Sequence, residues 1–233
     1  MSANKIKVTG FRIRNPEILL KIDKIATQHN IPVLGVNIGT MGFIAELESG
    51  ELELLRKIPK KEFTIENRSM LDITVSNGTQ QTFHEIALND AVVTKGAIAR
   101  VIQIAICCDG VEATSFSGDG VILCTPTGST AYSMSAGGPI VEPSAKNFLI
   151  TPICAHAMLA KSIVVAPSRV VTVRVGKVGR HNAFLSVDGG RAFRLSVGDE
   201  ITVKSSQKAT RLVRLKNTSF FEILNKKFIE KMR

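Results

Sequence analysis

The sequence is poor in aromatic residues: its 233 residues include no tryptophan, a single tyrosine and 11 phenylalanines. Proteins that bind single-stranded nucleic acid use exposed aromatic rings as platforms on which the bases stack. The low aromatic content therefore argues against nucleic acid as a partner.

Long apolar runs are missing as well. No uninterrupted apolar stretch of the sequence reaches the roughly 18 to 20 residues that a membrane-spanning helix needs. The sequence does not open with a basic stretch followed by an apolar run, as a secretory leader would. We therefore expect a cytoplasmic protein that is neither secreted nor inserted into a membrane.

Cysteines are few, and they lack the paired spacing of metal ligands. The four are Cys107, Cys108, Cys124 and Cys154. Adjacent cysteines on a strand point to opposite faces, so Cys107 and Cys108 would not act together. The cysteines are expected to be reduced core residues, and the sequence predicts no metal site formed by protein ligands.

Three common active-site motifs are also absent. The sequence contains neither the P-loop pattern G-x-x-x-x-G-K-[ST] nor the Rossmann fingerprint G-x-G-x-x-G. It also lacks G-x-S-x-G, so Ser129 is not predicted to be a hydrolase nucleophile. A nucleotide site in this protein must therefore be of another kind.

The formal net charge of +10 calls for an anionic partner. Nucleic acid, a membrane surface or a phosphorylated small molecule would each satisfy it. The densest basic groups, at residues 57–61 and 226–233, are typical of solvated faces or tails. Charge alone does not choose among these partners.

The first part of the sequence has the local order of an α/β layer. Residues 15–26 predict an amphipathic helix, because Asn15-Pro16-Glu17 suits a first turn and Ile18, Ile22 and Ile25 share one stripe. The apolar run at 31–36 predicts a buried strand leading into a glycine loop at 37–43. One helix and one strand cannot complete such a layer. Residues 1–55 are therefore expected to be the remnant of an α/β (Rossmann-like) domain.

The rest of the sequence predicts strands. From about Ser69 the apolar period changes to two, as in Leu71, Ile73 and Val75, and the Asn77-Gly78 turn follows. Further strands are predicted at residues 101–108, 111–116, 170–175, 183–187, 200–204 and 211–215. Many short strands separated by turns predict an all-β, sandwich-like domain, placed at residues 56–215, and hence an α+β protein overall. Ser219 and Glu222 have the spacing of a capping box and predict a terminal helix.

One stretch has an unusual composition. Residues 125–138 (TPTGSTAYSMSAGG) are mainly small hydroxylated residues and glycines, directly after the apolar strand 121–124. Such a segment exposes backbone N–H groups and hydroxyls at close range, which suits a ribose or a phosphate. A flexible surface loop is the alternative on composition alone, although Pro126 and Tyr132 would stiffen the segment.

Two acidic residues are expected near this stretch. Asp90 follows Asn89 at a strand start, and Asp119 lies between Gly118 and Gly120. Taken singly, each is typical of a turn. Taken together they suit a nucleotide, because a carboxylate can accept from two ribose hydroxyls and an Asn amide can both donate to and accept from an adenine edge.

At these positions the sequence resembles the NAD kinase family. The similarity runs through residues 33–43, 88–93, 119–143, 151–156, 186–189 and 211–221, in the family's order. The block with TPTGSTAYS and AGGP is specific, whereas the others are weak alone. The family fold has an α/β domain that also receives the last helix, and a β-rich second domain. The resemblance therefore implies that residues 216–233 return to residues 1–55.

The resemblance also implies a dinucleotide site. Its residues are Phe43, Asn89, Asp90, Arg100, Asp119, Thr127, Thr130, Ala131, Tyr132, Ser133, Met134, Ser135, Cys154 and Asp188. Asn89 and Asp90 would hold the adenosine part of NAD, Asp119 would contact the nicotinamide half, and Asp188 matches a region near the nicotinamide side. Cys154 would reach the pocket from a neighbouring subunit, so a homo-oligomer, dimer or tetramer, is implied. Gly190 and Ser117 depart from side chains that are frequent in the family.

A larger departure concerns catalysis. Family members carry a Gly-Gly-Asp-Gly motif roughly twenty residues before the strand matched here by residues 33–36, and its Asp is the expected base. Residues 8–14 (VTGFRIR) occupy that place, so the catalytic residue is unknown. The first hypothesis is an NAD kinase that uses NAD, Mg²⁺ and ATP or polyphosphate to form NADP. The rival is an NAD(P)-binding module without catalytic activity.

Overall fold

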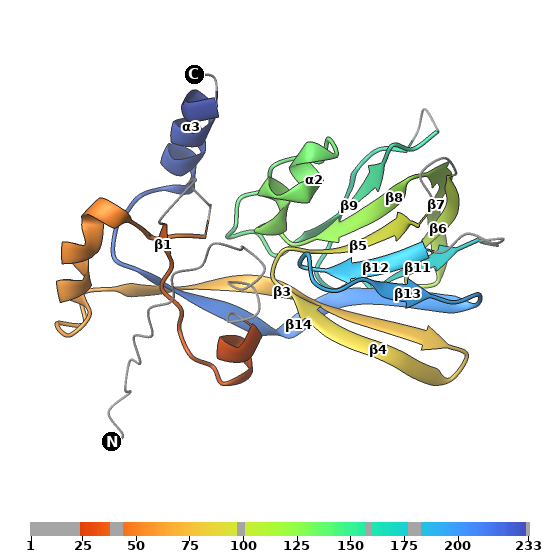
Figure 1. Ribbon diagram of the computed structural model, residues 1–233, viewed down its shortest axis with the longest axis horizontal. Coiled ribbons are helices and arrows are strands. Elements are labelled where there is room, and N and C mark those ends of the chain that lie inside the picture. Colours follow the sequence, from red (N-terminus) through yellow and green to blue (C-terminus); the bar gives the residue numbers. More distant parts are fainter. Residues whose placement is uncertain (1–23, 38–43, 97–100, 157–159, 177–182, 232–233) are drawn as a thin grey trace. The chain divides into compact units, whose positions relative to one another are not determined.

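The structure is a computed structural model that describes residues 24–37, 44–96, 101–156, 160–176 and 183–231 (Figure 1). It divides into two compact units. The first comprises Met1–Arg68 with Thr210–Arg233, and the second comprises Ser69–Ala209. The predicted boundaries at residues 55 and 215 lie outside the second unit and remain predictions. Phe43, Arg100 and residues 8–14 lie outside the described residues.

The second unit is built on two six-stranded antiparallel sheets, which confirms the predicted sandwich. One sheet has the order β10-β9-β8-β5-β12-β13 and the other β4-β3-β14-β11-β6-β7. The strands of the first sheet are β5 (Asp90–Lys95), β8 (Gly120–Cys124), β9 (Phe148–Ile153), β10 (Ile163–Val165), β12 (Ala183–Val187) and β13 (Phe193–Leu195). Those of the second are β3 (Thr64–Asn77), β4 (Gln80–Ala87), β6 (Ile102–Cys108), β7 (Val111–Gly118), β11 (Val171–Val175) and β14 (Asp199–Arg214).

Alternation along the strands explains this architecture. In β3 the side chains of Leu71, Ile73 and Val75 are buried, and in β12 those of Ala183, Leu185 and Val187 are buried. All six belong to one apolar cluster to which both sheets contribute. Because successive side chains of a strand point to opposite faces, each sheet turns one apolar face toward this shared core.

Two hairpins are closed by tight turns that contain glycine, and the turn predicted at Asn77-Gly78 begins one residue later. In the β6–β7 turn, Asp109 has φ +51° and Gly110 has φ +83°, as a type I′ turn requires at both central positions. In the β3–β4 turn, Asn77 pairs with Gln80, so Gly78 is the first central residue, and its φ is +58°. Glycine and aspartate adopt this left-handed region at low cost, which is why these turns form here.

Strand β14 differs from the prediction. Two strands were expected at residues 200–204 and 211–215, but β14 runs without interruption for 16 residues, from Asp199 to Arg214. Residues 205–208, between the two predicted strands, are polar. They contain neither glycine nor proline, so nothing in the backbone stops the hydrogen-bond ladder, and polar side chains are tolerated on an exposed strand surface.

The first unit contains short elements. β1 (Val36–Asn37) pairs in parallel with β2 (Leu47–Glu48), and the 3-10 helix η1 (Ser49–Lys57) follows. The predicted buried strand at 31–36 is wrong in extent. Only Val36 lies in β1, Val33 forms an isolated bridge with Leu212, and residues 32–37 are half-buried. In the predicted helix 15–26, the described residues from 24 onward are helical, to residue 28.

The terminal helix α3 (Phe220–Lys231) is confirmed with its cap. The Ser219 N–H donates to Glu222 Oε2 over 2.7 Å, and the Glu222 N–H donates to Ser219 Oγ over 3.2 Å. This reciprocal pair is the predicted capping box. It satisfies two of the N–H groups that a helix start otherwise leaves without partners.

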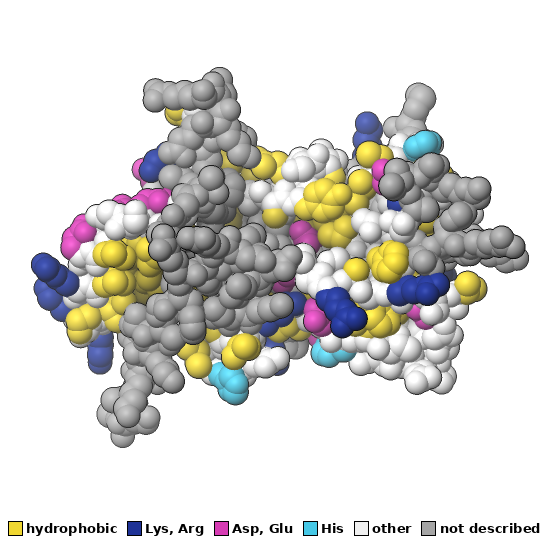
Figure 2. Space-filling view, viewed as in Figure 1, with side chains coloured by type: hydrophobic (Ala, Val, Ile, Leu, Met, Phe, Trp, Pro, Cys, Tyr) yellow, Lys and Arg dark blue, Asp and Glu magenta, His cyan; other side chains and the backbone are white. Residues whose placement is uncertain are grey.

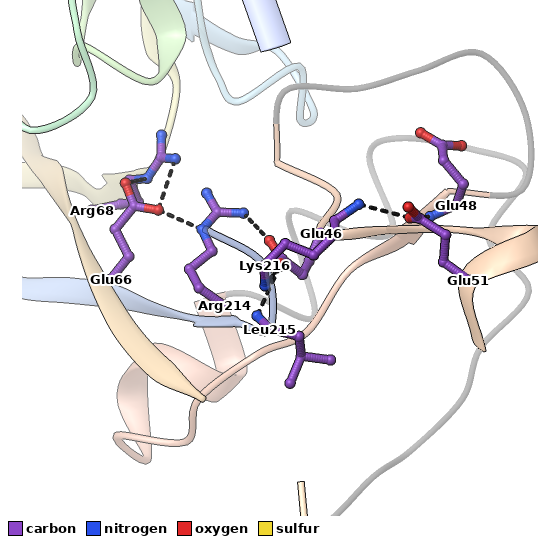
Figure 3. Close-up of polar contacts among 8 residues, drawn as sticks. All are labelled: Glu46, Glu48, Glu51, Glu66, Arg68, Arg214, Leu215 and Lys216. Atoms are coloured by element: carbon purple, nitrogen blue, oxygen red, sulfur yellow. Dashed lines mark hydrogen bonds and ion pairs between the residues drawn. The ribbon is translucent and has the colours of Figure 1, made fainter. Parts of the chain in front are cut away.

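A charged network fixes the chain just before α3 (Figure 3). Buried Glu46 accepts from the N–H groups of Leu215 and Lys216 over 2.7 and 2.8 Å, and from Arg214 Nη1 over 3.0 Å. Arg214 Nε also reaches Glu66 over 2.5 Å. Removing one partner of a buried ion pair leaves an uncompensated charge and costs about 3–5 kcal/mol. The network therefore helps to hold the first unit together.

Candidate functional site

The sheet that contains β5 and β8 has a second face. On one face, Ala91, Val93 and Leu123 belong to the shared core, whereas Val92 and Cys124 belong to a separate cluster. We call the face that carries this separate cluster the outer face. Asp90 pairs with Cys124 across the two strands, and side chains alternate along them. Asp90 and Thr94 therefore lie on the outer face with Cys124.

The hydroxyl-rich segment packs on the outer face. It contains the 3-10 helix η2 (Gly128–Thr130) and the short helix α2 (Tyr132–Ser135). Ser133 Oγ lies 2.9 Å from Thr151 Oγ1 of β9, and Ala136 packs against the outer-face cluster. Ser129 and Ser133 are fully buried. The segment is therefore an ordered cover of the sheet and not a flexible surface loop.

Thr125 and Gly128 join this segment to the chain just before β5. The Thr125 N–H donates to Asn89 O over 2.9 Å, and Thr125 Oγ1 donates to Leu88 O over 2.5 Å. A Cβ atom on Gly128 would lie only 2.1 Å from Asn89 O. Glycine is therefore required at 128 because two backbones touch there.

Asn89 and Asp90 present their side chains at this junction. Asp90 is buried, with only 5% of the residue exposed. Among the described residues, its carboxyl forms no hydrogen bond or ion pair. Burial, and secondarily the negative charge of Asp188, raise the pKa of Asp90 to about 7. A buried carboxyl without a cation is a group whose acceptor atoms are open to a ligand.

Asp188 follows β12 and lies directly behind this pair. Its Oδ1 accepts from the N–H groups of Asn89 and Asp90 over 2.7 and 3.1 Å, and its Oδ2 accepts from Leu88 N–H over 2.9 Å. A buried N–H left without such a partner costs about 1–3 kcal/mol. Asp188 was expected in a region near the nicotinamide side of the ligand, and this placement remains a prediction. The structure brings Asp188 to the Asn89–Asp90 backbone.

Asp119 lies at the other end of the β5–β8 ladder. Its N–H donates to Ile153 O, its carbonyl accepts from Lys95 N–H, and its Oδ1 lies 2.5 Å from Lys95 Nζ. Lys95 lies five positions after Asp90 in β5, which corresponds to a distance of about 17 Å at the rise of an antiparallel strand. The two predicted acids are therefore at opposite ends of one ladder and do not act on the same ligand atom.

Sequence reasoning did not find Lys95. Its partner comes from the register of β5 against β8, which places Thr94 opposite Gly120 and so brings Lys95 beside Asp119. A lone lysine at a strand end carries no sequence signal of such a pair. Thr125 was also missed as a named residue, although it opens the predicted TPTGSTAYS block.

The remaining predicted residues are spread between the two ends. Tyr132 is 45% exposed on α2, and Ser135 is exposed on the same helix. Cys154 is exposed directly after β9, next to the Ile153 carbonyl that binds Asp119. Those that are buried or half-buried in the covering segment are Thr127, Thr130, Ala131, Ser133 and Met134.

On the face shown in Figure 2, the Lys and Arg side chains of the described residues lie in several separate places rather than in one stripe. No helix within the described residues is long and apolar enough to cross a membrane. In the same part of the chain, no three His, Cys, Asp or Glu side chains gather into a metal site.

Known proteins share this architecture. Residues 88–215 match the family model for the ATP-NAD kinase C-terminal domain. The NAD kinase of Carboxydothermus hydrogenoformans is 43% identical over 204 residues, which are 87% of this chain and 72% of that protein. The NAD kinase of Lachnoclostridium phytofermentans is 40% identical over 210 residues, or 88% of this chain and 74% of that protein.

Solved structures agree with the sequence matches. Yeast NADH kinase complexed with NADH gives a TM-score of 0.77 at 30% identity, covering 84% of this chain and 57% of the yeast chain. An NAD kinase from Archaeoglobus fulgidus in complex with ATP gives 0.66 at 30% identity, covering 80% of this chain and 69% of the other. The resemblance first seen around TPTGSTAYS is thereby confirmed, and this chain belongs to the NAD kinase family.

Proposed function

We propose that this chain is an NAD kinase, a phosphotransferase that moves the γ-phosphoryl group of ATP, or a phosphoryl group of polyphosphate, to the adenosine 2′-hydroxyl of NAD. The observation that carries the proposal is the Asn89–Asp90 pair beside the hydroxyl-rich segment on the outer face, where the buried Asp90 carboxyl has no hydrogen-bond partner among the described residues. Relatives named NAD kinase are 33% to 43% identical over most of the chain, and they favour the kinase over a non-catalytic binding module.

The two ends of the ladder suit the two halves of a dinucleotide. At one end, the Asp90 carboxyl can accept from ribose hydroxyls or an adenine amino group, and Asn89 can donate and accept beside it. At the other end, Asp119 would meet the nicotinamide half, and its ion pair with Lys95 supports a charged contact there. Their separation of about 17 Å along β5 calls for an extended ligand that contacts both.

The donor side of the reaction is proposed from relatives. The Archaeoglobus fulgidus structure contains ATP and the yeast structure contains NADH, which supports these classes of ligand here. Phosphoryl transfer depends on positioning and on neutralising the charge of the phosphates, for which Mg²⁺ is the usual companion of ATP. Because the described residues form no cation site of their own, Mg²⁺ is proposed only as that companion. The catalytic base is not assigned to any described residue.

The assembly and location are proposed on the same grounds. A homo-oligomer, dimer or tetramer, in the cytoplasm would bring Cys154 of one subunit to the site of another. Cys154 is exposed, as this role requires.

The proposal is tested with the purified chain in two measurements. NADP formation from NAD, ATP and Mg²⁺ is followed with an NADP-specific dehydrogenase, and NAD binding is measured by calorimetry. Turnover above background supports the kinase. Tight NAD binding without turnover would instead support the non-catalytic module, and absence of both would reject the proposed site.

A further inference from the structure

The backbone of residues 88–90 is held on both of its polar sides. All three N–H groups donate to the Asp188 carboxylate. The carbonyls of Leu88 and Asn89 accept from Thr125, and the carbonyl of Asp90 accepts from Asp188 N–H over 2.9 Å. Every backbone polar group of these three residues is thus satisfied within the protein. Within the part of the chain that the structure describes, the side chains of Asn89 and Asp90 have no such partners.

This arrangement sits where the chain changes sheets. β4 ends at Ala87 in one sheet, and β5 begins at Asp90 in the other, so Leu88 and Asn89 form the crossing between them. No ladder fixes the backbone at such a crossing. The Asp188 carboxylate accepts the hydrogen bonds that a neighbouring strand would otherwise accept. Hydrogen bonds to a charged acceptor are stronger than those between neutral groups.

The burial and the backbone conformation of Asp188 suit this position. It is 4% exposed, and its φ of +51° lies in the left-handed region that aspartate tolerates better than most residues. Both carboxylate oxygens are already engaged by protein N–H groups. A ligand would therefore meet Asn89 and Asp90 rather than the oxygens of Asp188.

We propose that Asp188 is a positioning residue. By accepting hydrogen bonds from the three backbone N–H groups of residues 88–90, it orients the Asn89 and Asp90 side chains toward the dinucleotide. The inference rests on the proposed function for the ligand itself. The proposed role places Asp188 at the adenosine end of the ligand, whereas the resemblance matched it to a region near the nicotinamide half.

Asp188 also sets the charge that Asp90 experiences. Among the described residues, the titratable groups facing Asp90 are Asp188, from the end of β12, and Cys124, from β8. Burial raises the pKa of Cys124 to about 12, so this thiol stays neutral near pH 7. Asp188 is thus the charged neighbour whose removal changes the pH at which Asp90 ionises.

The test measures the NAD dissociation constant of the full chain by calorimetry from pH 6 to 8. We expect Asp188→Asn to weaken binding about 10-fold, because the amide nitrogen would face the N–H of Leu88, and Asp188→Ala to weaken it more. The midpoint of the pH dependence should fall below the wild-type value in both variants. Asp109→Asn is the matched control: Asp109 also has φ +51° and accepts from a backbone N–H, of Val170, but in the β6–β7 turn.

The outcomes separate the inference from the function on which it rests. If the wild-type chain binds NAD and Asp188→Asn binds it with the same affinity and pH midpoint, the positioning role is wrong and the proposed function survives. A lower melting temperature with an unchanged pH midpoint would also overturn the role, because it would indicate stability alone. If the wild-type chain binds no NAD, the proposed function and the inference both fail. If Asp188→Ala does not fold, Asp188→Asn decides.

Discussion

The two ends of the β5–β8 ladder carry the same residue type in opposite settings. Asp90 is buried, has no cation beside it and has a pKa raised to about 7, chiefly by burial. The Asp119 side chain is 34% exposed and forms an ion pair with Lys95. A carboxyl that lacks a cation responds to pH, whereas an exposed ion pair responds to salt. The two ends of one bound dinucleotide would therefore be sensitive to different solution conditions.

The largest effect is expected from Gly128→Ala, which disrupts the Asp90 end alone. The added Cβ would lie 2.1 Å from Asn89 O, so the backbones must separate. We expect the free energy of unfolding to fall by about 3 kcal/mol or more, measured by chemical denaturation. Gly50→Ala is the control, because no atom lies within 4 Å of a Cβ at that position. Equal stability of the two variants would show that the junction is not tightly packed.

Asp90→Asn should remove the pH dependence of this end. The pKa of Asp90 rises from 3.8 to about 7 on folding, so the folded state keeps a proton that the unfolded state loses. The stability linked to this group is fully present below about pH 4 and is lost as pH rises through 7. Above pH 7 the variant should be more stable than wild type by a few kcal/mol, as chemical denaturation would measure.

NAD binding should respond in the opposite direction. Because ribose hydroxyls donate to an ionised carboxylate, wild-type affinity should increase as pH rises through 7, and Asp90→Asn should show a flat and weaker profile. Calorimetry at pH 6 and 8 measures both. Exposed Glu112→Gln serves as the control that should leave the profile unchanged. A wild-type affinity that is independent of pH would contradict the assignment of Asp90.

A smaller effect is expected at the Asp119 end. Lys95→Met frees the Asp119 carboxylate, which should then favour the cationic ring of NAD⁺ over neutral NADH by about 2- to 5-fold, with a gain that shrinks in high salt. Asp119→Asn should weaken binding of both forms and abolish the effect of Lys95→Met in the double variant. The ratio of NAD⁺ to NADH dissociation constants is the measurement. Additive effects in the double variant would mean that Lys95 acts independently of Asp119.

The strands of the sandwich were largely predictable from sequence. Alternation at Leu71, Ile73 and Val75 and at residues 183–187 follows from one buried face per strand, and turn residues such as Gly78 mark the ends. The continuity of β14 was not predictable, because a polar stretch without glycine or proline can be either loop or exposed strand. Likewise, residues 32–37 have the apolar composition of a buried strand, yet they are half-buried and pair at Val33, Val36 and Asn37.

The candidate site was predictable in composition but not in arrangement. The resemblance named Asn89, Asp90 and Asp119, yet the bonds of Asp188 to residues 98 to 100 positions earlier depend on the tertiary fold. The burial of Ser129 and Ser133 was likewise hidden, because small hydroxylated residues are common both in loops and in close backbone packing. Local sequence patterns carry no record of such distant partners.

The exposure of Cys154 has a practical consequence. It is the exposed member of the four cysteines, whereas Cys107 and Cys124 are buried and Cys108 is half-buried with a pKa raised chiefly by burial. A maleimide fluorophore should therefore attach first at Cys154, one residue beyond the carbonyl that anchors Asp119. The native sequence thus already provides a single labelling position, from which a change in emission would report occupancy of the nicotinamide end in real time.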